Sequence, residues 1–211
     1  MALQTHQLAC VRGERQLFAD INLDVEAGNV FRIVGSNGTG KTSLLRMLCG
    51  LSIPASGEVR WNKKNIRQNR EEYNQQLTYL GHASAIKDDL FAWENVVVAA
   101  TLSGKSISEN DACDALAQLG MEQAVDLPAR VLSQGQRKRV ALARLRFCLH
   151  TPLWILDEPF VALDKAAIMQ LQMMMNDHLR SDGMIIFTTH QEVELNDGRV
   201  KTLDLNRDTS C

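Results

Sequence analysis

Apolar residues in the first eighty positions fall into short groups separated by polar and glycine-containing turns. Residues 17–25 alternate in part between apolar and polar side chains, and 30–34 form a β-rich group that ends at a glycine. Two further short groups occur at 57–61 and 77–80. Short apolar groups bounded by turns are typical of strands. Residues 41–49, which lie between these groups, predict a helix.

From about residue 83 to 150 the apolar positions take the spacing that is typical of helices. We expect helices at 95–102, 108–119 and 134–149. Ser108, followed three positions later by Asp111, is typical of a helix start, because both side chains can accept hydrogen bonds from free backbone N–H groups. These helices predict a lobe, at about 83–150, that is inserted into the rest of the domain.

Strand patterns return after residue 150. Residues 153–157 and 184–189 each begin with four consecutive apolar residues, which predicts buried strands, and 165–180 predicts a helix between them. Residues 198–205 predict an edge strand. Strands that alternate with helices form mainly parallel sheets covered on both faces. We therefore expect one α/β domain spanning residues 1–211.

Composition narrows the class of protein. The chain has 211 residues, and its 23 Lys and Arg against 25 Asp and Glu give a net charge of −2. This balance provides no overall basic field for nucleic acid, so we expect no nucleic-acid partner. No apolar stretch is long enough to cross a bilayer, and the first ten residues lack the pattern of a secretion signal. We expect a cytosolic chain whose five scattered cysteines are reduced thiols.

Residues 35–42 (GSNGTGKT) fit the pattern G-x-x-x-x-G-K-[ST] without a mismatch. They follow a predicted strand and open a predicted helix, which is the context that a phosphate-binding loop requires. Backbone N–H groups and the helix N-terminus hold phosphate oxygens, the lysine reaches the β- and γ-phosphates, and the threonine hydroxyl binds Mg²⁺. The predicted nucleotide contacts are Gly35, Ser36, Asn37, Gly38, Thr39, Gly40, Lys41, Thr42 and Ser43. Lys41 is also predicted to be catalytic, and Thr42 a Mg²⁺ ligand.

Asp157 and Glu158 end the apolar group that starts at residue 153. Ligands of α/β sheets bind beyond the carboxyl ends of the strands, so both carboxylates are expected near the phosphate loop. Asp157 suits the acid that holds Mg²⁺ in nucleotide hydrolases. Glu158, whose side chain points elsewhere because strand side chains alternate, suits the group that deprotonates the attacking water.

Residues 132–136 (LSQGQ) open a predicted helix and resemble the signature of ATP-binding-cassette (ABC) ATPases. Residues 162–164 (ALD) match the D-loop of that family, and His190, after a buried strand, matches its switch histidine. The resemblance covers about residues 3–205. It implies a P-loop NTPase fold with a mainly parallel core sheet, an N-terminal antiparallel β subdomain and the inserted helical lobe.

The same resemblance implies a homodimer in which two cassettes enclose two ATP molecules head to tail. The phosphate loop of each copy then faces the signature of the other. Ser133, Gly135 and Gln136 are therefore predicted to contact nucleotide, since Ser133 caps a helix whose N-terminus carries partial positive charge. His190 is predicted to be catalytic, through the γ-phosphate or the attacking water.

Two positions depart from the pattern of the family. The aromatic residue that usually stacks on adenine is replaced by Arg12, whose guanidinium plane can also stack on a base, with weaker base preference. The glutamine expected after the strand at 77–80 is replaced by His82. His82 can donate or accept a hydrogen bond near Mg²⁺-bound water, and we group it with the metal site; an ordinary surface histidine is the alternative.

Residues 79–82 (YLGH), 154–160 (WILDEPF) and 188–191 (TTHQ) together resemble the ATP-binding subunits of the haem exporter-like complex of bacterial cytochrome c maturation. This resemblance implies an ATPase or translocase on the cytoplasmic face of the bacterial inner membrane. It implies integral membrane permease subunits as partners and a role in releasing the haem-loaded chaperone. Haem is expected to be handled by those partners, because methionines at helical spacing, such as those between 169 and 175, usually fill cores.

Three alternatives remain at this point. They are a soluble ABC ATPase acting on nucleic acid or ribosomes, the ATPase of another ABC exporter, and an inactive regulatory cassette. Phe91 and Trp93 could line a groove for a membrane subunit or belong to the core. The adjacent Arg137, Lys138 and Arg139 cannot share one helix face, and we expect a solvated surface there.

Overall fold

The computed structural model describes residues 1–190, 195 and 199–206. Its centre is a sheet in which every pair of neighbouring strands runs parallel. The strand order is β10 (Arg199–Asp204), β4 (Asn29–Val34), β9 (Met184–Thr188), β8 (Leu153–Leu156) and β7 (Leu77–Leu80). The parallel core sheet predicted from the sequence is thus present, with β10 at one edge as expected.

Strands β8 and β9 are buried along their whole length, and their side chains serve two separate cores. Leu153 and Ile155 belong to the core around helix α1 (Lys41–Leu48), whereas Trp154 and Leu156 belong to the core around the other large helices. Successive strand side chains point to opposite faces, so a continuous apolar run is what a sheet covered on both faces requires.

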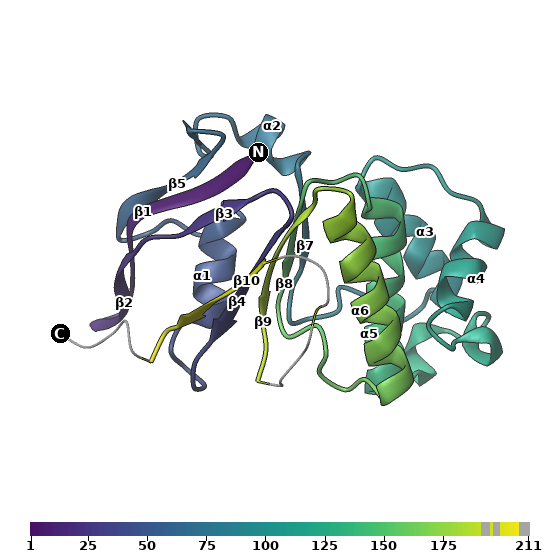
Figure 1. Cartoon of the computed structure of the whole chain (residues 1–211). Helices are drawn as coiled ribbons and strands as arrows, with labels where there is room; N and C mark the ends of the chain where they lie inside the picture. The colour runs from purple at the N-terminus through teal and green to yellow at the C-terminus, as the bar shows by residue number, and fades with distance from the viewer. Residues whose placement is uncertain (191–194, 196–198, 207–211) are drawn as a thin grey trace.

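A second, antiparallel sheet covers the other side of α1 (Figure 1). Strand β1 pairs with β2, β3 and β5 in the antiparallel sense, and β5 pairs with β6. The bounds are β1 (Ala2–Arg12), β2 (Arg15–Ile21), β3 (Asp24–Glu26), β5 (Ser56–Trp61) and β6 (Lys64–Asn65). This is the antiparallel β unit that was expected at the N-terminal end of the chain.

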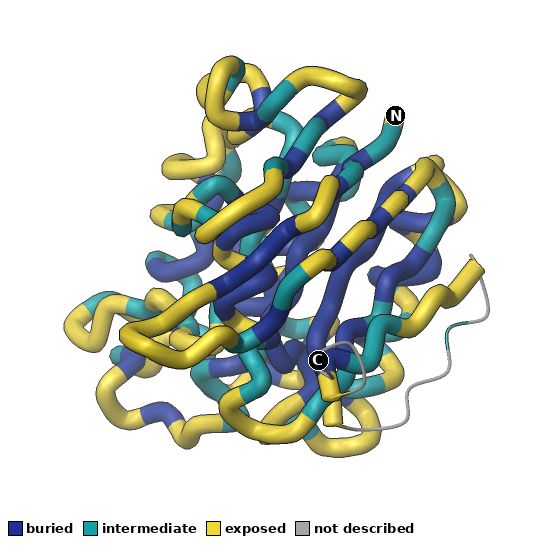
Figure 2. Tube along the Cα trace, turned by 90° about the vertical axis from the view of Figure 1, so that its left-hand side faces the viewer, coloured by how far each residue is buried: buried dark blue, intermediate teal, exposed yellow. Residues whose placement is uncertain are grey.

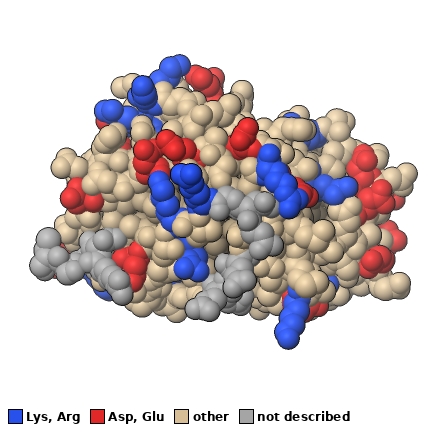
Figure 3. Space-filling view, viewed as in Figure 1, with Lys and Arg blue, Asp and Glu red and all other residues tan. Residues whose placement is uncertain are grey.

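The remaining large helices lie on the opposite face of the parallel sheet (Figure 1). Between β7 and β8 the chain forms α3 (Ala92–Leu102), α4 (Glu109–Ala117) and α5 (Gln134–Ala143), and α6 (Lys165–Arg180) follows β8. Figure 2 shows the buried trace along the central strands and exposed turns around them. On the face shown in Figure 3, acidic side chains gather at the end of the molecule that carries α4.

The single strand predicted at 17–25 is wrong, because the structure divides it into β2 and β3. At the break between β2 and β3, the side chain of Thr5 in β1 forms the hydrogen bonds that the backbone of a continuous strand pair would form. The Thr5 hydroxyl donates to the carbonyl of Ile21 over 2.8 Å and accepts from the N–H of Leu23 over 2.8 Å. Both buried backbone groups therefore keep a partner without a continuous strand.

The bounds of two predicted helices differ from the structure by three or more residues. Helix α3 starts at Ala92 rather than 95, because Glu94 accepts a hydrogen bond from the N–H of Phe91 and so caps an earlier first turn. The helix predicted at 134–149 tightens into a 3₁₀ helix at Arg144–Cys148. The Cys148 carbonyl at its end accepts from the indole N–H of Trp154. The short helix α2 (Arg70–Asn74) was not predicted.

The solvated surface expected for the basic residues of α5 is wrong. Arg137 donates to the carbonyl of Ala129 over 2.9 Å and pairs with Asp88, and only 7% of Lys138 is exposed. Arg139 also donates hydrogen bonds within the chain, to Asp164 and to the carbonyls of Leu119 and Gly120. The helix packs against α3 and α4, and its three cations are partly or fully buried rather than solvated.

No helix among the described residues is long and apolar enough to cross a membrane. Cys10, Cys49, Cys113 and Cys148 are free thiols, as expected for four of the five cysteines. Three residues named in the sequence predictions, Gln191, Gly198 and Cys211, lie outside the described residues.

Candidate functional site

The phosphate loop connects the end of β4 to the start of α1 and depends on glycine at two crowded positions. Gly40 has φ +103° and lies so close to β2 that an added Cβ would be 3.1 Å from the Phe18 ring and 3.2 Å from Leu17. A Cβ on Gly35, at φ +152°, would be 2.7 Å from the hydroxyl of Thr39. Glycine alone adopts such angles without strain, so the loop closes tightly around its backbone N–H groups.

Lys41 folds back over this loop. Its Nζ donates to the carbonyls of Gly35 (2.8 Å) and Ser36 (3.3 Å) and lies 3.1 Å from Nε2 of His190. Only 8% of Lys41 is exposed. The ammonium group is thereby held at the inner side of the loop, where the phosphate oxygens of a nucleotide are predicted to bind.

Asp157 joins the loop to the end of β8. Its Oδ2 accepts from the Thr42 hydroxyl over 2.8 Å, and its Oδ1 accepts from the Thr188 hydroxyl over 2.8 Å. The sequence separates Thr42 and Asp157 by 115 positions, and the parallel arrangement of β4, β9 and β8 brings them into contact. Both side chains present oxygen atoms, which are the ligands that Mg²⁺ prefers.

Glu158 follows with an unusual backbone, since its φ is +47°. Its N–H donates to the Thr188 hydroxyl over 2.8 Å, and its Oε1 lies 3.4 Å from Nε2 of His190. That oxygen is buried and has no hydrogen-bond partner in the described part of the chain. A buried carboxylate oxygen with free acceptor capacity suits a group that takes a proton from water.

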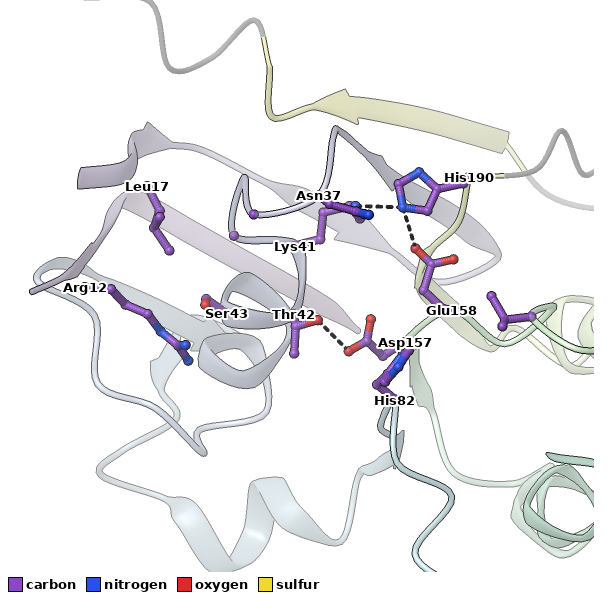
Figure 4. Close-up of a pocket in the computed structure, with 13 residues that line it drawn as sticks. Arg12, Leu17, Asn37, Lys41, Thr42, Ser43, His82, Asp157, Glu158 and His190 are labelled. Atoms are coloured by element: carbon purple, nitrogen blue, oxygen red, sulfur yellow. Dashed lines mark hydrogen bonds and ion pairs between the residues drawn. The ribbon is translucent and has the colours of Figure 1, made fainter. Parts of the chain in front are cut away.

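His82 lines the same cavity, and Figure 4 shows it beside Asp157. An imidazole nitrogen is not a preferred ligand of Mg²⁺, so His82 suits contact through a coordinated water better than direct coordination. The described residues include no cluster of three or more His, Cys, Asp or Glu side chains that could hold a metal ion by themselves. A magnesium ion bound to Thr42 and Asp157 would therefore keep water or phosphate oxygens as its other ligands.

A buried cation also faces the two carboxylates. Burial lowers the pKa of Lys138 on α5, and the charges of Asp157 and Glu158 oppose that shift. Burial, with the charge of Asp157 as the second cause, raises the pKa of Tyr79 to about 12. The charge of Asp157, directly after β8, therefore acts on the pKa of both Lys138 and Tyr79.

The cavity has a volume of about 530 Å³, which is in the range of small-molecule sites. It brings together most of the predicted residues, namely Arg12, Asn37, Gly38, Gly40, Lys41, Thr42, Ser43, His82, Asp157, Glu158 and His190. Two lining residues, Leu17 and Val161, were missed. Neither carries a sequence signal, because an aliphatic side chain gains a role here only from its place beside the loop.

Three predicted nucleotide contacts of the loop do not line this cavity: Gly35, Ser36 and Thr39. The Ser36 hydroxyl donates to Oδ1 of Asn206 over 2.8 Å, and the Thr39 hydroxyl donates to the Ser36 carbonyl over 3.0 Å. These side chains shape the loop from outside. Asn206, which also accepts from the N–H of Ser36, was not recognised from the sequence.

The signature residues lie apart from this cavity, at the start of α5. The exposed Ser133 accepts from the N–H of Gln136 over 3.2 Å, and Oε1 of Gln136 accepts from the N–H of Ser133 over 2.9 Å. Gly135 packs so closely against the turn after Glu158 that a Cβ would be 2.6 Å from the carbonyl oxygen of Ala162. One chain therefore presents two separate predicted nucleotide surfaces.

Comparison with known proteins gives a consistent picture. A family described as "ABC transporter" matches residues 18–161. The chain is 48% identical to the cytochrome c biogenesis ATP-binding export protein CcmA of Nitrosospira multiformis, covering 96% of this chain and 98% of that protein. It is 49% identical to the protein of the same name from Dechloromonas aromatica, covering 96% and 99%.

A solved structure also resembles the fold. It is a dimeric ATP-binding cassette in a post-hydrolysis state bound to ADP and phosphate, with a TM-score of 0.77. The identity is 20%, and the match covers 90% of this chain and 88% of that one. At this identity the likeness concerns the fold alone.

Proposed function

The chain belongs to the ABC transporter family, among its cytochrome c biogenesis ATP-binding export proteins, and we propose that it hydrolyses ATP for the haem exporter-like complex of cytochrome c maturation. In that complex it drives release of the haem-loaded chaperone. The relatives favour this role over a soluble ATPase that acts on nucleic acid or ribosomes. The observation that carries the proposal is the 2.8 Å bond between Thr42 and Asp157, beside Glu158 in one cavity.

In this proposal the loop holds the triphosphate and Lys41 contacts its β- and γ-phosphates. Thr42 and Asp157 would hold Mg²⁺, which would supply positive charge against the phosphate oxygens. The fit rests on two oxygen donors that already lie 2.8 Å apart. His82 would hydrogen-bond to water beside Asp157, and Arg12 contacts the base.

Glu158 takes the proton of the attacking water, using the buried Oε1 that has no other hydrogen-bond partner in the described chain. His190 lies between Glu158 and Lys41, at 3.4 Å and 3.1 Å, and so spans the place where the γ-phosphate and water meet. His190 positions the water or the phosphate, whereas Glu158 accepts the proton.

The proposal also includes a second copy of the chain and membrane partners. Ser133, Gly135 and Gln136 contact the nucleotide of the other copy in a head-to-tail homodimer, which is supported by their separation from the cavity. Integral membrane permease subunits hold the dimer at the cytoplasmic face of the inner membrane and handle the haem. Phe91, 41% exposed at the start of α3, offers an apolar contact for them, whereas Trp93 is partly buried and packs against the core.

Glu158→Gln tests the role of the general base. We expect this variant to bind ATP as tightly as the unaltered chain and to lose at least about 100-fold in kcat, since the amide cannot accept the proton. ATP-bound dimers should accumulate, as measured by light scattering with and without ATP. In cells that lack the unaltered chain, the variant should fail to restore covalent haem attachment to cytochrome c.

Glu72→Gln is the matched control, because Glu72 is an exposed acid that pairs with Lys64 at 3.8 Å and does not line the cavity. It should behave as the unaltered chain in every assay. Near-normal hydrolysis by Glu158→Gln would remove Glu158 from the base role. Full cytochrome c maturation without any ATP turnover would contradict the proposed function itself.

A further inference from the structure

The nucleotide cavity has two chemically different ends, which Figure 4 displays. Lys41, Glu158 and His190 lie at one end, and Arg12 and Leu17 lie at the other. Leu17 is fixed in place by the close approach of β2 to the loop, where an added Cβ on Gly40 would be 3.2 Å from Leu17 Cβ. A nucleoside triphosphate held at the loop therefore extends its base toward Arg12 and Leu17.

Among the described residues, no Phe, Tyr or Trp lines this cavity. At the base end the side chains are one aliphatic group, Leu17, one cation, Arg12, and the hydroxyl of Ser43, which Figure 4 shows beside Arg12. Arg12 is exposed and forms no hydrogen bond or ion pair with the part of the chain that the structure describes. The residue opposite Arg12 in the β1–β2 hairpin is Arg15, which carries the same charge. The hairpin position opposite Arg12 therefore provides no ion-pair partner for its guanidinium.

The chemistry of these three side chains contains nothing that rejects guanine, because the Ser43 hydroxyl can either donate or accept a hydrogen bond. A guanidinium plane stacks on any base, because every base has a π-face. Edge-on, the guanidinium offers only N–H donors. On the N7 edge of the purine, guanine presents two acceptors, O6 and N7, whereas adenine presents the acceptor N7 beside an amino donor. Leu17 contributes contact area without a polar group that could read the edge of a base.

We propose that this site accepts purine nucleoside triphosphates in general, with Arg12 as the residue that contacts the base, so that GTP is used about as well as ATP. This inference rests on the proposed function, since it concerns the nucleotide consumed at the same cavity. It deepens that function by assigning the substrate class. Affinity in this site comes from the triphosphate, and the base adds a contact that does not depend on its identity.

Equilibrium binding and hydrolysis of ATP and GTP by the full chain test the proposal, with a fluorescent nucleotide displaced by each. The unaltered chain should bind and hydrolyse the two within about threefold of each other, since a stacked guanidinium distinguishes them by less than one good base-edge pair. Arg12→Ala should raise Kd and KM for both nucleotides equally, by about 3- to 30-fold, and leave kcat unchanged.

Arg15→Ala is the matched control, because it removes the same side chain from the same hairpin at a position that does not line the cavity. It should alter neither nucleotide's Kd by more than about twofold. Arg12→Tyr supplies an aromatic plane instead and should restore the Kd for ATP, which shows that the contact is stacking rather than charge alone.

Two results overturn the proposal. One is a preference of the unaltered chain for ATP over GTP of more than about 30-fold, the discrimination that a polar base reader provides. The other is an unchanged Kd for both nucleotides in Arg12→Ala, which would place the base elsewhere. Equal binding of both nucleotides without any hydrolysis would instead contradict the ATPase function and leave the base contact standing.

Discussion

The side chain of Thr188 connects the two acidic residues of the candidate site, Asp157 and Glu158. It is fully buried at the end of β9. Its hydroxyl donates to Asp157 and accepts from the N–H of Glu158, both over 2.8 Å. Asp157 in turn accepts from Thr42 of the phosphate loop. The position of both carboxylates relative to the loop therefore depends on a hydroxyl in the neighbouring strand.

Thr188→Val keeps the shape of this side chain and removes the hydroxyl. Two buried groups, the N–H of Glu158 and Oδ1 of Asp157, then lose a partner, which costs about 1–3 kcal/mol for each unsatisfied group. We expect a lower free energy of unfolding in denaturant titrations and a loss of ATP turnover greater than the loss of ATP binding. Thr188→Ser, which retains the hydroxyl, should preserve turnover; if both variants hydrolyse ATP normally, Thr188 does not position the carboxylates.

At the scale of elements, the signature helix α5 is fastened to the start of α6. Arg139 on α5 donates to Asp164 over 2.7 Å and to the carbonyls of Leu119 and Gly120 over 3.1 and 3.3 Å. Asp164 also caps α6, where its Oδ1 accepts from the N–H of Ala167 over 2.9 Å. This backbone N–H is the first cause that lowers the pKa of Asp164, and the charge of Arg139 adds to it.

Arg139→Ala should therefore loosen α5 from the turn that follows Glu158. Loss of the hydrogen bonds to the two carbonyls should reduce stability by about 1–2 kcal/mol, measured as a shift of the denaturant midpoint. ATP turnover should fall while ATP binding by the isolated chain is retained, because Arg139 does not line the cavity.

Arg130→Ala is the appropriate comparison, since Arg130 pairs with Asp89 at 3.2 Å on the exposed surface of the same lobe. Such a surface change should alter stability by less than about 0.5 kcal/mol. Equal effects of the two variants would show that Arg139 acts as an ordinary surface charge.

At the scale of the whole molecule, the chain carries two predicted nucleotide surfaces that it does not join. The phosphate loop, Asp157 and Glu158 share one cavity, and Ser133 lies outside it. A fixed cassette fold separates them, so a second copy is the simplest way to bring a signature to a phosphate loop.

The variants Lys41→Ala and Ser133→Arg should show that the two surfaces affect ATP binding and ATP turnover differently. Lys41→Ala removes a phosphate contact and should weaken ATP binding. Ser133→Arg should leave the Kd for ATP of the isolated chain within about twofold of normal and reduce kcat at least about 100-fold, since it obstructs only the partner's nucleotide. Equilibrium binding and steady-state turnover check both expectations.

Ser108→Arg controls for the loss of a helix cap, because Ser108 caps α4 with the same reciprocal geometry, accepting from the N–H of Asp111 over 3.2 Å. Its cost in stability should match that of Ser133→Arg, about 1 kcal/mol, without an effect on turnover. Normal turnover by Ser133→Arg would mean that one chain hydrolyses ATP with its own cavity alone.

Much of this protein could be predicted from local patterns. Residues 35–42 specify a tight loop by their glycines, and 153–156 specify a strand buried on both faces by an unbroken apolar run. Helix α6 has the bounds that its pattern predicts, because Asp164 caps its start. In these cases the residues that determine the structure are neighbours in the sequence, so the pattern alone carries the information.

Only the tertiary structure decided how distant residues meet. It divided 17–25 at the hydroxyl of Thr5, turned the cations of α5 inward, and placed Leu17 beside Gly40 and Asn206 beside Ser36. The sequence by itself determined the loop, the acids and the signature, together with the class of chemistry that they serve. Their distances, and the separation of the signature from the cavity, come from the packing of the two sheets and five large helices that the described residues form, which no local pattern encodes.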